Sequence, residues 1–304
     1  METILEVLVF GLQRGAIFGL VGLGLALVYK ATKILNFAQG ELGTVPAFVC
    51  LMVMTGFSVA GDETADRGLL LPATVAAVAV GGAFGVLLYA AVIRRLGKVS
   101  PVTSLVATAA VALLLTTIEI NVFEARARRF PRPVNGGFRL VGTEVIVDWH
   151  TVVILAVLAG VAVALAAFFR SAPGVALLAT ADDPFAAELQ GVPVERMRAM
   201  AWGAAGMLGA LAGVLGAGVF ESLTPGLVTS TFMIPAFTGV VLGGITSMPG
   251  AVLGGFALGV VSQAAIQIVT SFDIDVPGPP QLAVFLVLLA VLLVRPQGLL
   301  GRRA

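Results

Sequence analysis

The feature that most constrains this chain is a run of about 50 residues, Ser222 to Phe272, without a single charged side chain. A helix needs about 20 apolar residues to cross the hydrocarbon core of a bilayer, so the run has room for two crossings with a turn near Ser247 to Gly250. Of all residues 12% are charged and 59% apolar, whereas soluble domains carry about 25% charged residues. The sequence therefore predicts an integral membrane protein.

Seven further apolar runs are delimited by charged residues, and the first of them, short from Gly15 to Tyr29, extends backward past Arg14 to Ile4. Each is expected to be helical, because an unpaired backbone group in lipid costs several kcal/mol. The runs are Ile4–Tyr29, Leu42–Gly61, Gly68–Ile93, Val99–Ile118, Trp149–Phe169, Ala199–Phe220 and Val276–Val294. The predicted fold is all-α, a polytopic bundle of eight or nine spans forming one transmembrane domain over residues 1–304. The count is eight if residues 1–29 or 229–244 are re-entrant.

Basic residues mark the cytoplasmic side of a membrane protein. With nine crossings, the loop Asp62, Glu63 and Asp66 falls on one side, and most basic residues fall on the other. These are Lys30, Lys33, Arg94, Arg95, Lys98, Arg170, Arg196, Arg198, Arg295, Arg302 and Arg303. The N-terminus is therefore expected outside and the C-terminus in the cytoplasm. The arginine-rich loop 123–148 is the exception, and partial alternation over Arg139–Val147 allows a short external hairpin there.

Polar residues between the first two spans form a candidate substrate pathway. Asn36, Gln39 and Glu41 lie too close to the membrane for a plain surface loop, and polar groups at this depth must line water or pair with protein. The stretch is either a tight cytoplasmic turn or a break that offers hydrogen bonds to substrate or to a gate. Gln263 and Gln267 share one helix face, which lines either the pore or a helix interface.

Several glycines recur at intervals of four residues, a spacing that lets two helices approach closely. We predict that they are packing positions, and the alternative is that their helices slide during a transport cycle. They are Gly11, Gly15, Gly19, Gly209, Gly213, Gly255 and Gly259.

The loop 171–198 contains a short predicted helix. Asp182 or Asp183 can cap it, Pro184 suits its first position, and Gly191 terminates it. Phe185 and Leu189, four residues apart, form a small apolar face. Such a face packs either into a groove on another protein or against the chain's own membrane domain.

Several classes of function are disfavoured. The sequence has no G-x-x-x-x-G-K-[ST] phosphate loop, no H-E-x-x-H and no G-x-S-x-G. With one cysteine and one histidine it offers no Cys/His metal cluster, and its net charge of +1 gives no sign of a nucleic-acid partner. We therefore expect no catalytic residue, metal or cofactor. Any energy for transport must come from a partner chain.

Four motifs in order resemble the LivH-type permease family, the pore subunits of bacterial ABC importers for branched-chain amino acids. The first runs from Gly15–Leu20 through Leu25–Tyr29 to Asn36–Glu41. The others are Gly174–Asp183 with Ala186, Ala187, Gly191 and Val192, then Val240–Ala251, and the ending Arg295–Gly301. The sequence departs from the family at Gln39, where His is frequent, and at Val175 and Leu178, where Arg is common.

The resemblance implies a multi-pass inner-membrane subunit that is not itself an enzyme. Its implied partners are a second, LivM-like permease, two cytoplasmic ATPases, an extracytoplasmic solute-binding protein and membrane lipid. Related permeases carry urea, short amides or aromatic acids, and an ATPase-independent channel is a further alternative. The implied coupling residues within 171–198 are Asp182, Asp183, Phe185, Ala186, Glu188, Leu189 and Gly191.

Overall fold

The computed structural model describes residues 2–57, 65–97, 99–140, 142–273, 275–295 and 298–299. Asp62, Glu63, Lys98, Arg302 and Arg303, which entered the orientation prediction, lie outside these ranges. The elements in chain order are α1 (Glu2–Thr32), η1 (Phe37–Gln39), α2 (Glu41–Met54), η2 (Arg67–Leu69), α3 (Leu70–Leu88), η3 (Tyr89–Ile93), α4 (Arg94–Leu96), α5 (Pro101–Phe123), β1 (Arg128–Arg129), β2 (Gly137–Arg139), β3 (Ile146–Asp148), α6 (Trp149–Phe168), α7 (Ala172–Asp182), α8 (Pro184–Leu189), α9 (Val194–Phe220), β4 (Ser222–Leu223), η4 (Val228–Phe232), α10 (Met233–Gly243), α11 (Met248–Ser271) and α12 (Pro279–Val294).

The helices fit the predicted eight or nine spans. Among the described residues, seven helical stretches are long and apolar enough to cross a membrane, and Val228–Gly243 and Pro279–Val294 are shorter apolar helices. The turn predicted within the uncharged run is confirmed, because α10 ends at Gly243 and α11 begins at Met248. The all-α prediction is also confirmed, since the four described strands are each two or three residues long.

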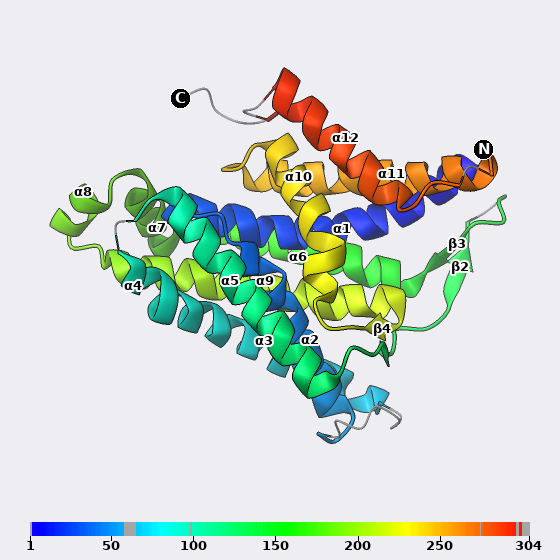
Figure 1. The fold of residues 1–304 in the computed structure, drawn as a ribbon, viewed down its shortest axis with the longest axis horizontal. Coiled ribbons are helices and arrows are strands. Elements are labelled where there is room, and N and C mark those ends of the chain that lie inside the picture. The colour runs from blue at the N-terminus through cyan, green and yellow to red at the C-terminus, as the bar shows by residue number, and fades with distance from the viewer. Residues whose placement is uncertain are drawn as a thin grey trace.

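The helices form a bundle with two distinct ends (Figure 1). α4 and α8 lie at one end, which we call the α8 end, and β2 and β3 lie at the other, which we call the hairpin end. α1 is the central helix, and every residue from Gly15 to Val28 is buried. A helix that is buried on all sides is expected to be apolar on all faces, as this stretch of α1 is. In contrast, α5 and α6 are apolar but largely exposed, as expected for helices that face lipid or another membrane chain.

The repeated glycines lie at helix crossings. α1 and α11 run antiparallel, with Gly11 against Val260 and Gly19 against Val252. A Cβ on Gly259 would lie 2.5 Å from the Gly15 Cα, and one on Gly15 would lie 2.7 Å from the Phe256 Cα, so no side chain fits between these backbones. Similar contacts join α9 to α2 through Gly209 and Gly213, and Gly255 packs on α1.

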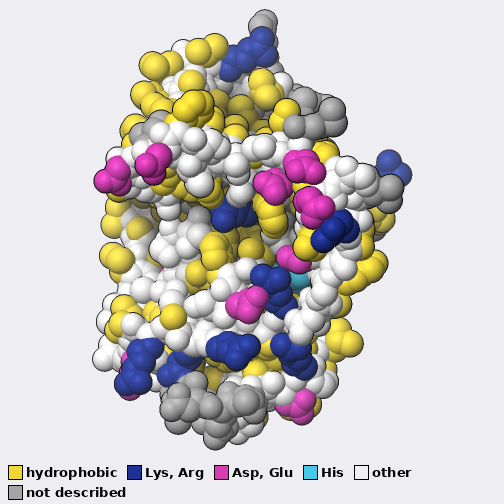
Figure 2. Space-filling model, turned by 90° about the vertical axis from the view of Figure 1, so that its right-hand side faces the viewer, with side chains coloured by type: hydrophobic (Ala, Val, Ile, Leu, Met, Phe, Trp, Pro, Cys, Tyr) yellow, Lys and Arg dark blue, Asp and Glu magenta, His cyan; other side chains and the backbone are white. Residues whose placement is uncertain are grey.

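The arginine-rich loop lies at the hairpin end and is largely neutralised by acids. β2 and β3 pair antiparallel, with Phe138 opposite Val147, which confirms the predicted hairpin. β1 pairs with β4 and so joins this loop to the end of α9. The described ion pairs are Arg132 with Asp148 and Glu221, Arg139 with Glu144, and Arg126 with Glu124. Figure 2 shows these mixed charges gathered on one face.

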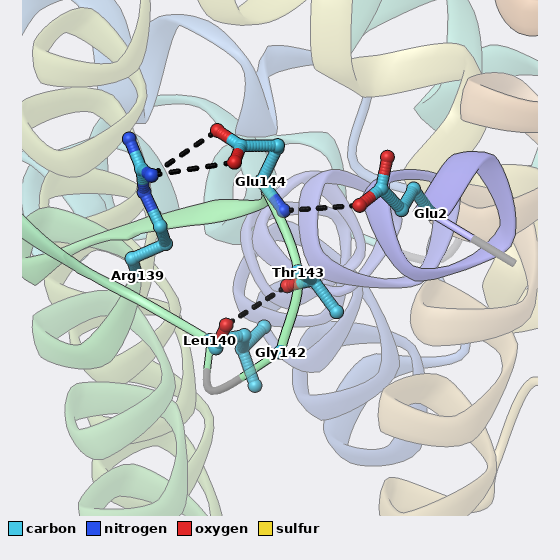
Figure 3. Close-up of a pocket in the computed structure, with 6 residues that line it drawn as sticks. All are labelled: Glu2, Arg139, Leu140, Gly142, Thr143 and Glu144. Atoms are coloured by element: carbon cyan, nitrogen blue, oxygen red, sulfur yellow. Dashed lines mark hydrogen bonds and ion pairs between the residues drawn. The ribbon is translucent and has the colours of Figure 1, made fainter.

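The hairpin also holds the start of α1. The Glu144 N–H donates a 3.2 Å hydrogen bond to the carboxylate of Glu2, and the Thr143 hydroxyl donates to the Leu140 carbonyl across the hairpin turn (Figure 3). The open cavity at this point is lined by Glu2, Arg139, Leu140, Gly142, Thr143 and Glu144, and we assign it no role beyond anchoring the first helix.

Candidate functional site: two broken segments that meet

The polar stretch after α1 turns back into the bundle. α1 ends at Thr32, and Lys33 adopts a left-handed conformation with φ of 56°, after which the chain is extended as far as η1. The Asn36 side chain caps η1 by accepting a 3.0 Å hydrogen bond from the Ala38 N–H. Asn36, Gln39 and Glu41 are each 0% exposed. This segment is therefore a break inside the protein and differs from a surface turn.

The amides of this break bond to the protein itself. The Gln39 Nε2 donates to the Ala205 carbonyl of α9 at 2.9 Å, and the Asn36 Nδ2 donates to the Gln39 Oε1 at 3.3 Å. Glycines make room for the Gln39 side chain, because a Cβ on Gly24 would lie 2.9 Å from its Cδ and one on Gly209 would lie 3.2 Å from its Nε2. The first break is thus fixed between α1 and α9.

A second break precedes α10 and touches the first. Between β4 and α10 the chain forms a turn and then a π-helical turn, η4. The Val228 N–H donates a 3.1 Å hydrogen bond to the Thr44 hydroxyl of α2, and a Cβ on Gly40 would lie 2.7 Å from the Thr229 Cα. Irregular backbone within a bilayer is tolerated where protein or a water-filled cavity surrounds it. Here the two breaks pack against each other inside the protein.

Three polar side chains on one face of α5 hold these breaks. The Thr108 hydroxyl accepts from the Phe37 N–H at 3.1 Å and lies 3.2 Å from the Leu35 carbonyl. Further along, the Thr116 hydroxyl donates to Glu41 Oε1 at 2.8 Å. Glu119 Oε2 accepts from the Gly226 N–H, also at 2.8 Å. At 1.5 Å per residue, this row of contacts extends about 16 Å along α5.

Glu119 corrects one sequence prediction. The fourth span was expected to end at Ile118, because a charged residue follows, but α5 continues to Phe123 with Glu119 2% exposed. A carboxyl group within an apolar helix is itself a signal of a functional site. Sequence reasoning missed Thr108, Thr116 and Glu119 because it treated charge only as a boundary between spans.

The two glutamines of α11 lie elsewhere. Gln263 and Gln267 are half-buried, and the Gln263 Oε1 is a buried atom without a hydrogen-bond partner among the described residues. α11 packs on α1, α10 and α12, whereas the first break packs on α5 and α9. The structure therefore does not bring these glutamines together with Asn36, Gln39 and Glu41.

The predicted short helix is present at the α8 end. Asp183 rather than Asp182 caps α8, because its Oδ1 accepts from the N–H groups of Phe185 and Ala186 at 3.0 and 3.1 Å. The helix ends before Gly191, where φ is 80°. Phe185 and Leu189 are each 71% exposed.

A groove of about 680 Å³ lies beside α8. It is lined by α8, by η3 and by the starts of α5 and α9. Its charged residues include Lys33, Arg94, Glu188, Glu195 and Arg198. The preceding α7 was not predicted. Gly174 allows a tight turn between α6 and α7, since a Cβ there would lie 2.7 Å from the Phe169 Cα, and α7 packs on α1 and α9.

Comparison with known proteins places the chain in a family. Residues 7–295 match the family model for the permease component of branched-chain amino acid transport systems. The chain belongs to this family. The match includes both breaks, all of α5 and the short helix at the α8 end.

Named relatives cover nearly the same length. The permease is 29% identical to the high-affinity branched-chain amino acid transport system permease protein BraD of Pseudomonas aeruginosa, over 98% of this chain and 96% of BraD. It is 29% identical to LivH of Escherichia coli K12, over 96% and 94% of the two chains. It is 27% identical to a probable LivH of Methanocaldococcus jannaschii, over 93% and 88%.

A solved structure, "PsaBC from Streptococcus pneumoniae in complex with Fab", shares the fold. Its matching chain has a TM-score of 0.50 and 16% sequence identity, and the superposition covers 98% of this chain and 93% of that one. At this identity the likeness speaks for the fold alone. It supports the arrangement of the helices described above.

Proposed function

We propose that this permease is one pore subunit of an ATP-driven importer for branched-chain or related amino acids. The observation that carries the proposal is the family match over residues 7–295, together with relatives named as branched-chain amino acid permeases across almost their whole length. Since the sequence has no phosphate-binding loop, we expect separate ATPase chains to supply the energy.

The meeting point of the two breaks is our candidate gate on the substrate pathway. Discontinuous helices near the middle of a membrane are where transporters place substrate sites and hinges. Asn36 and Gln39 bond within the protein and are fully buried, so in this conformation they close the pathway rather than line an open channel. We expect them to change partners when the gate opens. Gln263 and Gln267, on a helix that packs elsewhere, are candidates for a helix interface.

α8 is our candidate coupling helix. Its exposed Phe185 and Leu189 form an apolar face beside a charged groove, which suits insertion into a cleft on an ATPase. Closure of paired ATPases on ATP would move α8, and the bundles of this chain and a second permease would reorient around the gate. The exposed apolar side chains of α5 and α6 are our candidates for contact with that second permease and with lipid.

A binding test checks the coupling helix. Phe185→Asp should leave membrane insertion intact but abolish co-purification of the ATPases. Phe272→Asp is the matched control, because Phe272 is 73% exposed at the end of α11. Normal ATPase co-purification with Phe185→Asp, or equal loss with Phe272→Asp, would contradict the assignment of α8.

An uptake test checks the transporter assignment and the solute. The permease is reconstituted in proteoliposomes with the proposed partner ATPases, second permease and binding protein. ATP-dependent uptake of leucine is expected. Uptake of urea, a short amide or an aromatic acid in place of leucine would change the solute class. Uptake by the permease alone, without ATP, would replace the importer assignment with a facilitator.

The proposed orientation places the α8 end in the cytoplasm and the N-terminus outside. Basic residues at the α8 end support it, and the arginines of the hairpin end are offset by the ion pairs described above. In a Cys50→Ser background, a cysteine at Phe138 should react with an impermeant maleimide in intact cells. A cysteine at Phe185 should react only after the membrane is opened, and the reverse pattern would invert the topology.

A further inference from the structure

The buried carboxyl groups of Glu41 and Glu119 face one another in the core of the bundle. Glu41 is 0% exposed and Glu119 is 2% exposed. Both carboxyls meet at Gly226, whose N–H donates to Glu119 Oε2 at 2.8 Å and on which a Cβ would lie 3.8 Å from Glu41 Oε1. Two carboxylates this close in a poorly solvated place repel each other strongly, so they do not both remain ionised. The pair therefore needs a cation or a proton.

Each of the four carboxyl oxygens can be assigned. Glu41 Oε1 accepts from the Thr116 hydroxyl, and Glu119 Oε2 accepts from the Gly226 N–H, both at 2.8 Å. The remaining two oxygens, Glu41 Oε2 and Glu119 Oε1, are buried and have no protein donor among the described residues. Because an oxygen of a carboxylate can only accept, a hydrogen bond between these two requires a hydrogen on one of them.

The segments that carry the two carboxyls and the second break provide no positive charge, and α1, which contacts η1 and η4, has its two basic residues, Arg14 and Lys30, outside its fully buried stretch Gly15–Val28. η1, α2, α5 and residues 222–232 are fully described, and none contains Lys, Arg or His. α3 and α9 pack on α2, and the charged residues of these two helices lie only in their terminal turns or just beyond their ends. These are Arg67, Arg94 and Arg95 around α3, and Glu195, Arg196, Arg198 and Glu221 around α9.

The first two basic residues after α5 are engaged elsewhere, and Arg126 forms an ion pair with Glu124. The Arg128 guanidinium donates to the Phe123 carbonyl and lies over the Phe123 ring. An internal ion pair therefore does not neutralise the two glutamates.

We propose that Glu41 and Glu119 form a proton-binding site. One proton is shared between the two carboxyl groups, and this hydrogen bond helps to hold α5 against both breaks. The single negative charge that remains is stabilised by the Thr116 hydroxyl and the Gly226 N–H. It also lies at the positive end of the α2 dipole, because Glu41 is the first residue of that helix. The proposal does not depend on which solute the permease carries.

Loss of this proton would loosen α5. Two facing carboxylates would separate, and the links from α5 to Glu41 and to Gly226 would weaken together. In the unfolded chain both glutamates are ionised at neutral pH, so the folded protein binds more protons. Stability must then fall as the pH rises and the shared proton is lost.

Infrared spectroscopy of the full chain in lipid nanodiscs tests the proton directly. At neutral pH the wild-type protein should show the C=O stretch of a neutral carboxyl group. Glu119→Gln should remove this band, and Glu41→Gln should shift it because an amide replaces the carboxylate partner. Glu124→Gln is the matched control, since Glu124 directly follows α5 and forms an ion pair with Arg126. A spectrum without the band, or a band that Glu119→Gln leaves unchanged, would overturn the proposal.

Thermal unfolding provides a second readout. Glu119→Gln should unfold near the wild-type temperature at neutral pH, because its amide can donate to Glu41 and accept from Gly226. The wild-type unfolding temperature should drop more steeply than that of Glu119→Gln as the pH becomes alkaline. Equal slopes would overturn the proposal, and so would recovery of the wild-type protein at alkaline pH by millimolar Na⁺ or ammonium, which would identify a cation site instead.

Discussion

The crossing of α1 and α11 allows the packing of this bundle to be tested quantitatively. A Cβ on Gly259 would lie 2.5 Å from the Gly15 Cα and closer still to the Gly11 carbonyl oxygen. Ordinary contacts between carbon atoms are about 3.5–4.0 Å, so Gly259→Ala must force the two helices apart by roughly 1 Å. Overpacking of this kind typically costs about 1–3 kcal/mol. The better helix propensity of alanine returns up to about 1 kcal/mol.

The matched variant is Gly160→Ala on α6, where an added Cβ would meet no heavy atom within 4 Å. It retains only the propensity gain, so the two variants should differ by about 2 kcal/mol in the free energy of unfolding. Thermal unfolding in detergent can be followed by tryptophan fluorescence, since Trp202 is fully buried in α9. Equal unfolding temperatures for Gly259→Ala and Gly160→Ala would refute the close approach of these helices.

Three further outcomes follow from buried polar groups and are measured on the same purified protein. Gln39→Leu should lower the free energy of unfolding by about 1–3 kcal/mol, because it leaves the buried Ala205 carbonyl without its donor. Thr116→Val should destabilise by about 0.6–1.7 kcal/mol through loss of the interhelical hydrogen bond to Glu41, whereas Thr117→Val, whose hydroxyl bonds the Leu113 carbonyl of its own helix, should be nearly neutral. Cys50 is 0% exposed and should react with a permeant maleimide only after unfolding, so rapid labelling of the folded protein would contradict its position.

The membrane class and the order of helices could be predicted from the sequence because each rests on a single local property. Apolar length predicted the spans, and Pro184 with Gly191 predicted the boundaries of α8. The turn between α10 and α11 was equally visible, since Pro249 and Gly250 interrupt a long apolar run. In all these cases the determining residues are neighbours in the chain.

The site depends on contacts between distant segments, and no local pattern reports them. The Gln39 amide reaches the Ala205 carbonyl, and the Thr44 hydroxyl accepts from Val228, across separations of more than 160 residues. Glu41 was noticed for its depth in the membrane, but its partner Glu119 was read as the end of a span. Side chains that pair across segments look, in one sequence, like isolated polar residues at the edges of helices.

The way in which α5 is held suggests which helix moves most easily. Between helices in lipid, apolar contact adds little driving force, because lipid tails are as apolar as leucine. α5 exposes Val102, Val106, Leu113 and Leu114, and its packing is concentrated on η1 and α2. Its attachment therefore depends mainly on hydrogen bonds to the two breaks, and interhelical bonds of this kind average about 0.6 kcal/mol each. Each of these bonds is comparable to thermal energy, so removal of the shared proton, which weakens two together, would loosen the helix that packs on the proposed gate.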